Sequence, residues 1–275
     1  RVIDERRISV LTSSRIEVVS GYVGQFRTRL RTAGGEALEV EHGAIVVATG
    51  ARQMTPSTYG CGRLAGVVTQ RELEARLEAA AAPAPANVVM IQCVGSRDEE
   101  HPYCSRVCCT EAIKNALAVR RRSPSTRVTI LYRDLRSYGF REDLYRQARL
   151  AGVRFLPFEA AAPPEVREGS ERLEVRVISP PEPRPRALPA DLVVLSAGIE
   201  PEPGNAELSR LLKLPLNREG FFLEAHVKLR PVDFAAEGIF LCGMAHSPRS
   251  LDETIGQARA AAVRAIGLLT KKELA

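Results

Sequence analysis

The sequence predicts an α/β fold made of two nucleotide-binding-like domains, with the second inserted into the first. One observation is a βαβ pattern: an apolar, β-branched run at 88–91, a helix over 111–119 and a second strand at 128–132. The other is an internal similarity between the runs 43–50 and 191–198. Each run indicates a buried strand that ends in small residues and glycine. One such strand in each half of the chain fits a first domain whose sequence is interrupted by the inserted second domain and then continues.

The first part of the outer domain is expected to span residues 1–82. Strand-like stretches between residues 7 and 23 precede an alternating hairpin arm at 25–32. An amphipathic helix is predicted over 70–81, and the stiff sequence Pro83-Ala84-Pro85 marks the domain boundary.

The run 43–50 is continuously apolar, which is typical of a strand buried on both faces. Its last residues, Ala48, Thr49 and Gly50, are small enough to let a ligand lie against the backbone. An ordinary core strand that ends in a glycine turn explains the same pattern, so both interpretations stay open.

The inserted domain is expected over 86–205, and the outer domain is expected to return over 206–275. After the βαβ unit, the inserted domain is predicted to hold a helix at 137–151, strands at 153–158 and 171–178, a proline-rich surface loop at 180–189, and the strand at 191–198. The return segment is predicted to hold a short helix at 206–212, an extended stretch at 220–229, a buried strand at 238–243 and a long helix at 251–269.

Four cysteines stand where the βαβ unit would carry a glycine-rich phosphate-binding turn. Cys104 lies one helical turn before Cys108, so their sulfurs share a face, and Cys93 can close the site from the end of the strand. Cys109 is adjacent to Cys108 and poorly placed to bond it. Soft thiolate ligands favour either a [4Fe–4S] cluster or zinc.

Alternatives to a cluster remain open at this point. Structural zinc usually sits on two short Cys-x₂₋₄-Cys hairpins, which this sequence lacks, and nothing marks the chain as secreted and disulfide-bonded. The lone cysteines Cys61 and Cys242 are expected to be buried, inert thiols. The four histidines show no metal-like spacing.

The run IQCVGSRDEEHPYCSRVCCTEAIKNAL resembles the A subunit of heterodisulfide reductase, the flavin- and iron–sulfur-containing component of complexes in methanogens, sulfate reducers and other anaerobes. A Cys-x(about 10)-Cys-x₃-Cys-Cys pattern binds a [4Fe–4S] cluster in that family, and it matches Cys93, Cys104, Cys108 and Cys109 residue for residue. GAIVVATGA near the start and GIFLCGM with GQARAAA near the end extend the resemblance over most of the chain.

The resemblance implies a two-dinucleotide-binding-domain flavoprotein of the thioredoxin-reductase type, with FAD in the outer domain. The implied FAD contacts are Ala48, Thr49, Gly50, Gly243, Met244 and Gln257. Related flavoproteins carry an acidic residue at the position of Met244, and that residue binds the ribityl chain of the flavin by a hydrogen bond. Methionine cannot make this hydrogen bond, so it is lost here. The helix at 251–269 can direct its N-terminal dipole at the pyrimidine end of the flavin, with Gln257 within reach, although a solvated glutamine fits equally well.

Lys114 lies five residues after Cys109 on the same predicted helix. In the family that this sequence resembles, a lysine at this spacing faces the flavin ring, where a cation stabilises the anionic reduced flavin. The resemblance therefore assigns Lys114 a catalytic role. The alternative is an ordinary solvated lysine.

The function implied by the resemblance is electron transfer between FAD and a [4Fe–4S] cluster, with flavin-based electron bifurcation in a multi-subunit complex. The implied partners are heterodisulfide reductase B- and C-like subunits and hydrogenase or dehydrogenase subunits. The first glycine-rich FAD motif is expected upstream of Arg1, so we expect the chain to be a piece of a longer protein and inactive by itself.

Two alternative functions are also compatible with parts of the sequence. The first is a zinc-stapled structural or interaction module without redox activity. The second is a pyridine-nucleotide-disulfide reductase, which is disfavoured because no Cys-x₂-Cys pair occurs. Arg133 and Arg136 follow the second strand of the βαβ unit, but without a glycine-rich turn they make only a weak NAD(P) phosphate site.

Composition sets the remaining limits. A chain of 275 residues with 45% hydrophobic and 26% charged residues is ordinary for one or two globular domains. The net charge of +6 is spread along the sequence without a basic block, so a nucleic-acid partner is not predicted. No apolar run reaches the roughly 20 residues of a membrane span, and the N-terminus lacks a signal-peptide core. The cysteine usage favours a reducing compartment, and we expect the cytoplasm.

Overall fold

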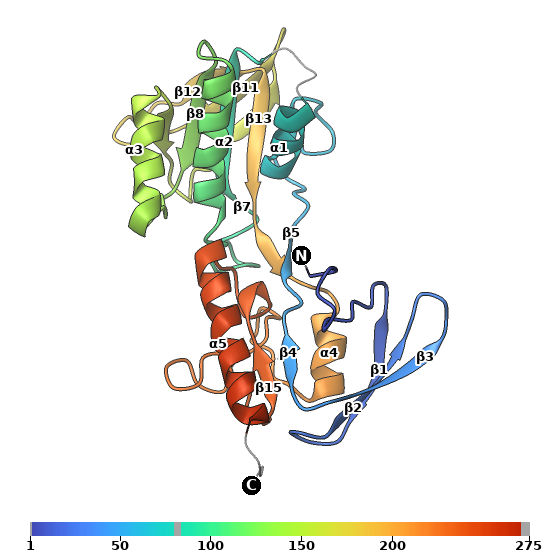
Figure 1. The fold of residues 1–275 in the computed structure, drawn as a ribbon. Coiled ribbons are helices and arrows are strands. Elements are labelled where there is room, and N and C mark those ends of the chain that lie inside the picture. Colours follow the sequence, from blue (N-terminus) through green and yellow to red (C-terminus); the bar gives the residue numbers. More distant parts are fainter. Residues whose placement is uncertain (1, 80–83, 271–275) are drawn as a thin grey trace. The chain divides into compact units, whose positions relative to one another are not determined.

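The computed structural model describes residues 2–79 and 84–270. The chain divides into two compact units (Figure 1): unit 1 comprises Arg1–Ala51 and Pro201–Ala275, and unit 2 comprises Arg52–Glu200. Unit 2 is therefore one continuous stretch of chain that interrupts unit 1.

A five-stranded parallel sheet forms the centre of unit 2. Its strand order is β6 (Val67–Thr69), β13 (Leu192–Ala197), β7 (Asn87–Val94), β8 (Arg127–Tyr132) and β9 (Arg154–Pro157). β7 and β13 are almost entirely buried. A strand covered on both faces needs apolar side chains in both directions, which explains the apolar runs at 88–91 in β7 and 192–195 in β13.

Helices cover one face of this sheet, and a small antiparallel sheet covers the other (Figure 1). The helices are α1 (Gln70–Ala79), α2 (Cys108–Arg122) and α3 (Glu142–Leu150), the last preceded by the short 3₁₀ helix η1 (Gly139–Arg141). The small sheet consists of β10 (Glu165–Glu168), β11 (Leu173–Val177) and β12 (Arg186–Ala190). Met90 packs with Ile113 of α2, whereas its neighbour Ile91 packs with Val175 of β11.

Two expectations about this unit were wrong. The domain boundary falls after Ala51 rather than near residues 83–85, because β6 pairs with β13 and thereby joins α1 to the inserted unit. Pro83, like the last residues of the helix predicted over 70–81, lies outside the described residues. The predicted loop at 180–189 also contains the first residues of β12, which pairs with β11.

Unit 1 combines an antiparallel sheet with a parallel pair of strands. The antiparallel sheet is β1 (Arg15–Ser20), β2 (Phe26–Arg31) and β3 (Ala37–His42), and β4 (Ile45–Val47) pairs in parallel with β15 (Ile239–Leu241). The helices are α4 (Asn205–Leu212), the 3₁₀ turn η2 (Gly243–Ala245) and α5 (Leu251–Leu269). Two short strands at the ends of the unit 2 segment, β5 (Ala51–Gln53) and β14 (Ile199–Pro201), form a separate pair. The core of unit 1 is aromatic, with Phe222 and Phe234 in edge-to-face contact.

The strand predicted over 43–50 is shorter and less buried than expected. β4 covers only Ile45–Val47, and the side chain of Val46 is 45% exposed. In the described part of the chain β4 has a single strand neighbour, β15, so burial on both faces is not achieved here.

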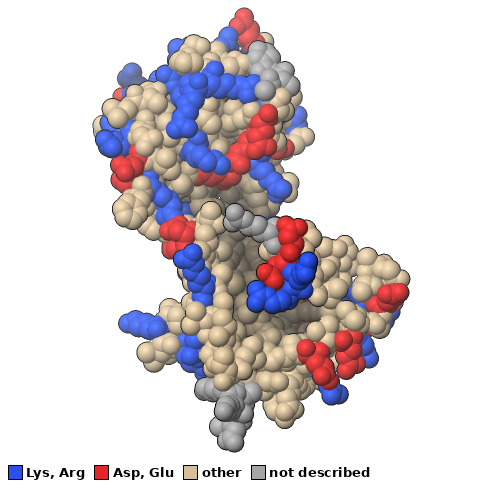
Figure 2. All heavy atoms as spheres, viewed as in Figure 1, with Lys and Arg blue, Asp and Glu red and all other residues tan. Residues whose placement is uncertain are grey.

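No helix within residues 2–79 and 84–270 is both long and apolar enough to cross a membrane. Basic and acidic side chains are interspersed on the face that Figure 2 shows. This distribution agrees with the spread of charge along the sequence.

Candidate functional site

The four candidate cysteines of unit 2 come from the carboxyl end of β7 and the start of α2. Cys93 is the penultimate residue of β7, Cys104 lies in the connection, and Cys108 and Cys109 are the first two residues of α2. All four are free thiols. The carboxyl end of a parallel strand and the N-terminus of the following helix meet at the same edge of the sheet, so the fold itself gathers these residues.

A bulge in β7 changes the direction of the chain at Cys93. After Ile91 the pairing with β13 shifts, so that Gln92 and Cys93 oppose the single residue Ser196. Cys93 has a φ of 61°, in the left-handed region, which costs a non-glycine residue roughly 1–2 kcal/mol. Strain of this kind persists where the surrounding structure imposes it, and it is common at functional sites.

The four thiols act on one another electrostatically. The pKa of Cys108 is raised well above its usual value, first by its hydrogen bond with Cys109, then by burial, and then by the charges of Cys109, Cys93 and Cys104. Burial raises the pKa of Cys93, and the charge of Cys109 adds to this effect. The hydrogen bond from Cys108 lowers the pKa of Cys109. These four residues are called the thiol group below.

Among the residues that the structure describes, no three His, Cys, Asp or Glu side chains are arranged as ligands of a single metal ion. The members of the thiol group are linked by their electrostatic effects on one another.

Arginine side chains surround the thiol group. Arg97 Nη1 lies 3.9 Å from Cys93 Sγ, and Arg136 forms a side-chain hydrogen bond with Cys104. Asp134 connects the two arginines, because its carboxylate accepts hydrogen bonds from Arg97 and, at 2.9 Å, from Arg136 Nε. Positive charge stabilises thiolates and any anionic group that they hold.

Sequence reasoning missed Arg97 and Asp134 and assigned Arg133 and Arg136 only to a weak phosphate site. In the structure, Arg133 Nη1 donates to the carbonyl oxygen of Arg97 at 2.7 Å, and its charge favours the Cys93 thiolate. One signal was available: residues 133–136 follow β8, and the carboxyl end of β8 lies beside that of β7 in the parallel sheet.

Glycines permit the close approach of β7 and β13 where both strands end. A Cβ on Gly198 would lie 2.6 Å from the carbonyl oxygen of Gly95, and a Cβ on Gly95 would overlap the side chain of Met54. Gly95 also has a φ of 69°. Only glycine fits both conditions, and it sets the direction in which the chain leaves β7 toward Cys104.

Lys114 of α2 forms an ion pair with α1. Its Nζ lies 2.5 Å from Glu74 Oε1, and the two side chains are 57% and 33% exposed. Lys114 is thus held by a partner within unit 2 rather than being an unattached surface charge. Its role beside a flavin stays a prediction.

The candidate flavin residues of unit 1 lie after the two parallel strands. After β4, the side chains of Ala48 and Thr49 are exposed, and Thr49 Oγ1 donates to Asn205 Oδ1 at 3.1 Å. Gly50 has a φ of 77°, and a Cβ there would meet nothing within 4 Å. The backbone at this strand end is therefore open to a ligand.

Gln257 is already engaged in hydrogen bonds. Its Oε1 accepts from the backbone N–H of Gly243 at 2.9 Å, and its Nε2 lies 3.0 Å from His246 Nδ1. The carboxamide therefore joins α5 to the turn that carries Gly243 and the half-buried Met244. A contact of Gln257 with a flavin stays a prediction.

His246 is held from both ring nitrogens. Nε2 lies 2.7 Å from Glu224 Oε2, while Nδ1 faces two donors, Arg249 Nη2 at 2.9 Å and Gln257 Nε2 at 3.0 Å. This network assigns the proton to Nε2 and leaves Nδ1 as the acceptor. Burial lowers the pKa of His246, and the charge of Arg249 lowers it further against the opposing effect of Glu224.

We expect the stability of unit 1 to fall as the pH is lowered below about 6.5, the ordinary pKa of histidine. The folded state keeps His246 neutral, so the unfolded chain binds the extra proton first in this range. Urea unfolding between pH 7.5 and 5.5 measures the effect. His246→Gln, whose amide can still donate to Glu224, should show a shallower pH dependence; equal slopes for both proteins would contradict the assignment.

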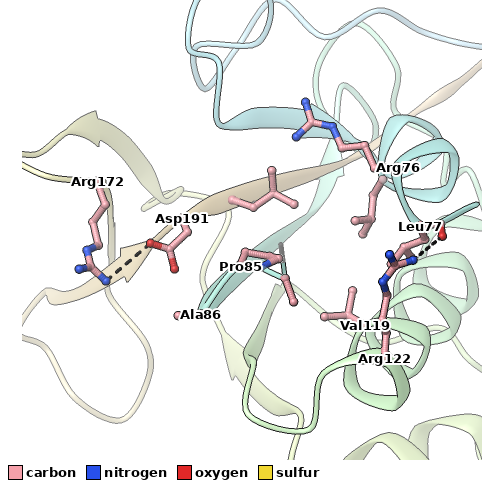
Figure 3. A pocket seen from close by; sticks show the side chains of 11 residues that line it. Arg76, Leu77, Pro85, Ala86, Val119, Arg122, Arg172 and Asp191 are labelled. Carbon is pink, nitrogen blue, oxygen red and sulfur yellow. Dashed lines mark hydrogen bonds and ion pairs between the residues drawn. The ribbon is translucent and has the colours of Figure 1, made fainter. Parts of the chain in front are cut away.

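A cavity of about 530 Å³ lies at the opposite edge of the sheet in unit 2 (Figure 3). Its lining includes Val119 and Arg122 near the end of α2, and Asp191, which pairs with Arg172. These residues precede β13 or end α2, whereas the thiol group follows β7 and starts α2. The cavity is therefore separate from the candidate site.

The comparisons with known proteins concern the whole chain and its fold. No family model matches the chain. The A subunit of the ferredoxin:CoB-CoM heterodisulfide reductase from Methanosarcina acetivorans is 39% identical over 86% of this chain and 34% of its own length. The iron-sulfur A subunit of the CoB–CoM heterodisulfide reductase from Methanocaldococcus jannaschii is 38% identical over 82% of this chain and 37% of its own length.

The chain is homologous to the A subunit of heterodisulfide reductase. A protein of Archaeoglobus profundus that is described as similar to this A subunit is a further relative, 34% identical over 88% of this chain. The chain spans about a third of the length of these relatives, with 34% to 39% covered.

Solved structures confirm the predicted fold of this heterodisulfide reductase homologue. LpdA from Mycobacterium tuberculosis matches 92% of the chain and 49% of its own, with a TM-score of 0.58 and 17% identity. Thioredoxin reductase from Lactococcus lactis matches 93% of the chain and 74% of its own, with a TM-score of 0.57 and 16% identity. The chain thus has the α/β architecture of two-dinucleotide-binding reductases, and at this identity the likeness concerns the fold alone.

Proposed function

We propose that this chain is the part of a heterodisulfide reductase A-like oxidoreductase that relays electrons between FAD in unit 1 and a [4Fe–4S] cluster in unit 2. The observation that carries the proposal is the thiol group, in which four free cysteines from the end of β7, the following connection and the start of α2 act on one another and are flanked by arginines. The free thiols also support a reducing compartment such as the cytoplasm.

The thiol group fits a [4Fe–4S] cluster in ligand number and in charge. Such a cluster takes one thiolate at each of four irons, so its ligands surround a larger body than a single ion. Arg97 and Arg136 would offset the negative charge of the bound cluster, and Asp134 holds both in place. When bound, the cluster supplies one-electron chemistry.

Unit 1 supplies features that fit FAD. The open backbone at Gly50 and the exposed Thr49 would accept a flavin against the strand end, and Gln257 holds the Gly243 turn. The apolar side chains of Leu251, Val263 and other residues of α5 are exposed within the described residues. We infer that further segments of a longer protein cover this exposed apolar surface and complete the flavin unit.

The homology also suggests partner subunits and electron bifurcation for the longer protein. The names of the relatives refer to ferredoxin and to the CoB–CoM heterodisulfide, and one relative is the A subunit of an H₂:CoB–CoM heterodisulfide,ferredoxin reductase. We infer that the longer protein works in a comparable multi-subunit complex with flavin-based electron bifurcation.

Anaerobic purification of the full-length protein tests the proposal. We expect about four iron atoms per chain with a broad thiolate-to-iron absorption near about 400 nm, and about one FAD, since a preformed pocket retains its ligand. A colourless protein that contains zinc would instead establish the structural metal module. Iron without flavin after FAD reconstitution would reject the flavin half of the proposal.

A further inference from the structure

Gln92 is a buried amide with no hydrogen-bond partner. Its side chain is 1% exposed, and neither Oε1 nor Nε2 finds a partner among the described residues. Buried polar groups in native proteins nearly always have partners, so an orphaned carboxamide in the central strand requires an explanation.

The bulge in β7 places Gln92 on the same side of the sheet as the thiol group. Alternation along β7 directs Val88 and Met90 toward α2, where they pack with Ile113, and Gln92 continues this row. Gln92 and Cys93 both oppose Ser196, and the end of β7 that carries them lies at the same edge of the sheet as the start of α2. The amide therefore lies on the α2 face, next to the first of the four cysteines.

Two other buried amides on this face are satisfied by the protein itself. Gln70 Nε2 donates to Ser196 Oγ at 3.1 Å, and Asn115 Nδ2 donates to Gln70 Oε1 at 2.9 Å. Gln70 and Asn115 are as buried as Gln92. The packing of this face thus supplies partners for two amides and leaves the one beside Cys93 without any.

We propose that Gln92 Nε2 donates a hydrogen bond to a sulfur of the cluster that the thiol group holds. The inference rests on the proposed function and deepens it by naming a positioning residue. An N–H donor stabilises the more negative, reduced state of an iron–sulfur centre more than the oxidised state, so Gln92 raises the reduction potential. The same contact satisfies a donor that is otherwise buried without a partner.

Gln92→Met tests the inference, because methionine has a similar length and no amide. In the full-length protein we expect wild-type iron content and a cluster midpoint potential shifted to more negative values. The expected size is a threefold to tenfold change in the ratio of reduced to oxidised cluster, where tenfold corresponds to about 59 mV for one electron. Redox titration followed by electron paramagnetic resonance measures it.

The cluster-free protein gives a second, independent readout. Without the cluster the amide of Gln92 has no partner, so Gln92→Met should unfold at a higher urea concentration than the wild type. Gln70→Met is the matched control: it removes hydrogen bonds to Ser196 and Asn115, so it should unfold at a lower urea concentration and leave the cluster potential unchanged.

The outcomes separate the two proposals. Full-length wild-type protein without iron would reject the proposed function itself. Iron-loaded wild type and Gln92→Met with coincident potentials would overturn the role of Gln92 alone. Equal potential shifts in Gln92→Met and Gln70→Met would also overturn it, because they would show a general effect of disturbing this face.

Discussion

Single replacement of Cys93, Cys104, Cys108 or Cys109 by serine is expected to remove most of the iron from the full-length protein. A [4Fe–4S] cluster needs a thiolate at each iron, and a serine hydroxyl is a harder and far less acidic ligand. The thiol group also shares one electrostatic environment, so the loss of one ligand affects the rest. Iron and acid-labile sulfide per chain, measured after anaerobic purification, report the effect.

The chain contains its own controls for this experiment. Cys61 and Cys242 lie outside the motif, and burial raises the pKa of both thiols, which keeps them protonated. Cys61→Ser and Cys242→Ser should therefore retain wild-type iron. If all six variants lost iron to the same extent, the assignment of the four ligands would be wrong.

Replacement of Lys114 by methionine is expected to lower the flavin midpoint potential while leaving folding nearly unchanged. A cation near the flavin favours its anionic reduced form. About 1–2 kcal/mol of lost interaction corresponds to about 20–45 mV for a two-electron couple. The stability should change by no more than about 0.5 kcal/mol, because Lys114 is largely exposed and exposed ion pairs contribute little. Spectroelectrochemical titration of the full-length protein measures the potential.

A substitution of Glu74, the ion-pair partner of Lys114, is expected to shift the flavin potential in the opposite direction. Glu74→Gln removes the carboxylate that offsets the charge of Lys114, so the flavin potential should rise rather than fall. Opposite shifts in the two variants would establish an electrostatic role for Lys114. Coincident titration curves for wild type and both variants would leave Lys114 as an ordinary surface lysine paired with α1.

The core of unit 2 was predictable from the sequence because its signals are local. β7 and β13 are buried on both faces, and such strands need an uninterrupted apolar run that is visible without any partner. α2 follows from apolar residues at helical spacing, and they do form its buried face. The four cysteines were equally visible, since three of them lie within a short stretch that starts this helix.

The domain boundary and the burial of β4 were not predictable in this way. A proline-rich stretch resembles a linker whether or not the preceding helix packs on the next domain. The pairing of β6 with β13 and the contacts of α1 with α2 and β13, all between residues far apart in the sequence, place α1 in unit 2. Likewise, the apolar run at 43–50 shows that a strand there could be buried on both faces. Whether Val46 is buried depends on which strands and helices lie next to it, and it is exposed.

The sequence by itself therefore determined the α/β class, the central strands and the set of four thiols, because each depends on the spacing of residues within one short segment. The tertiary structure alone decided what surrounds those thiols. Asp134 meets Arg97 from a neighbouring strand end, and the bulge that leaves both Gln92 and Cys93 opposite Ser196 exists only through pairing with β13. Such contacts join segments that are distant in the chain, and the packing of the sheet, rather than local sequence pattern, fixes which of them meet.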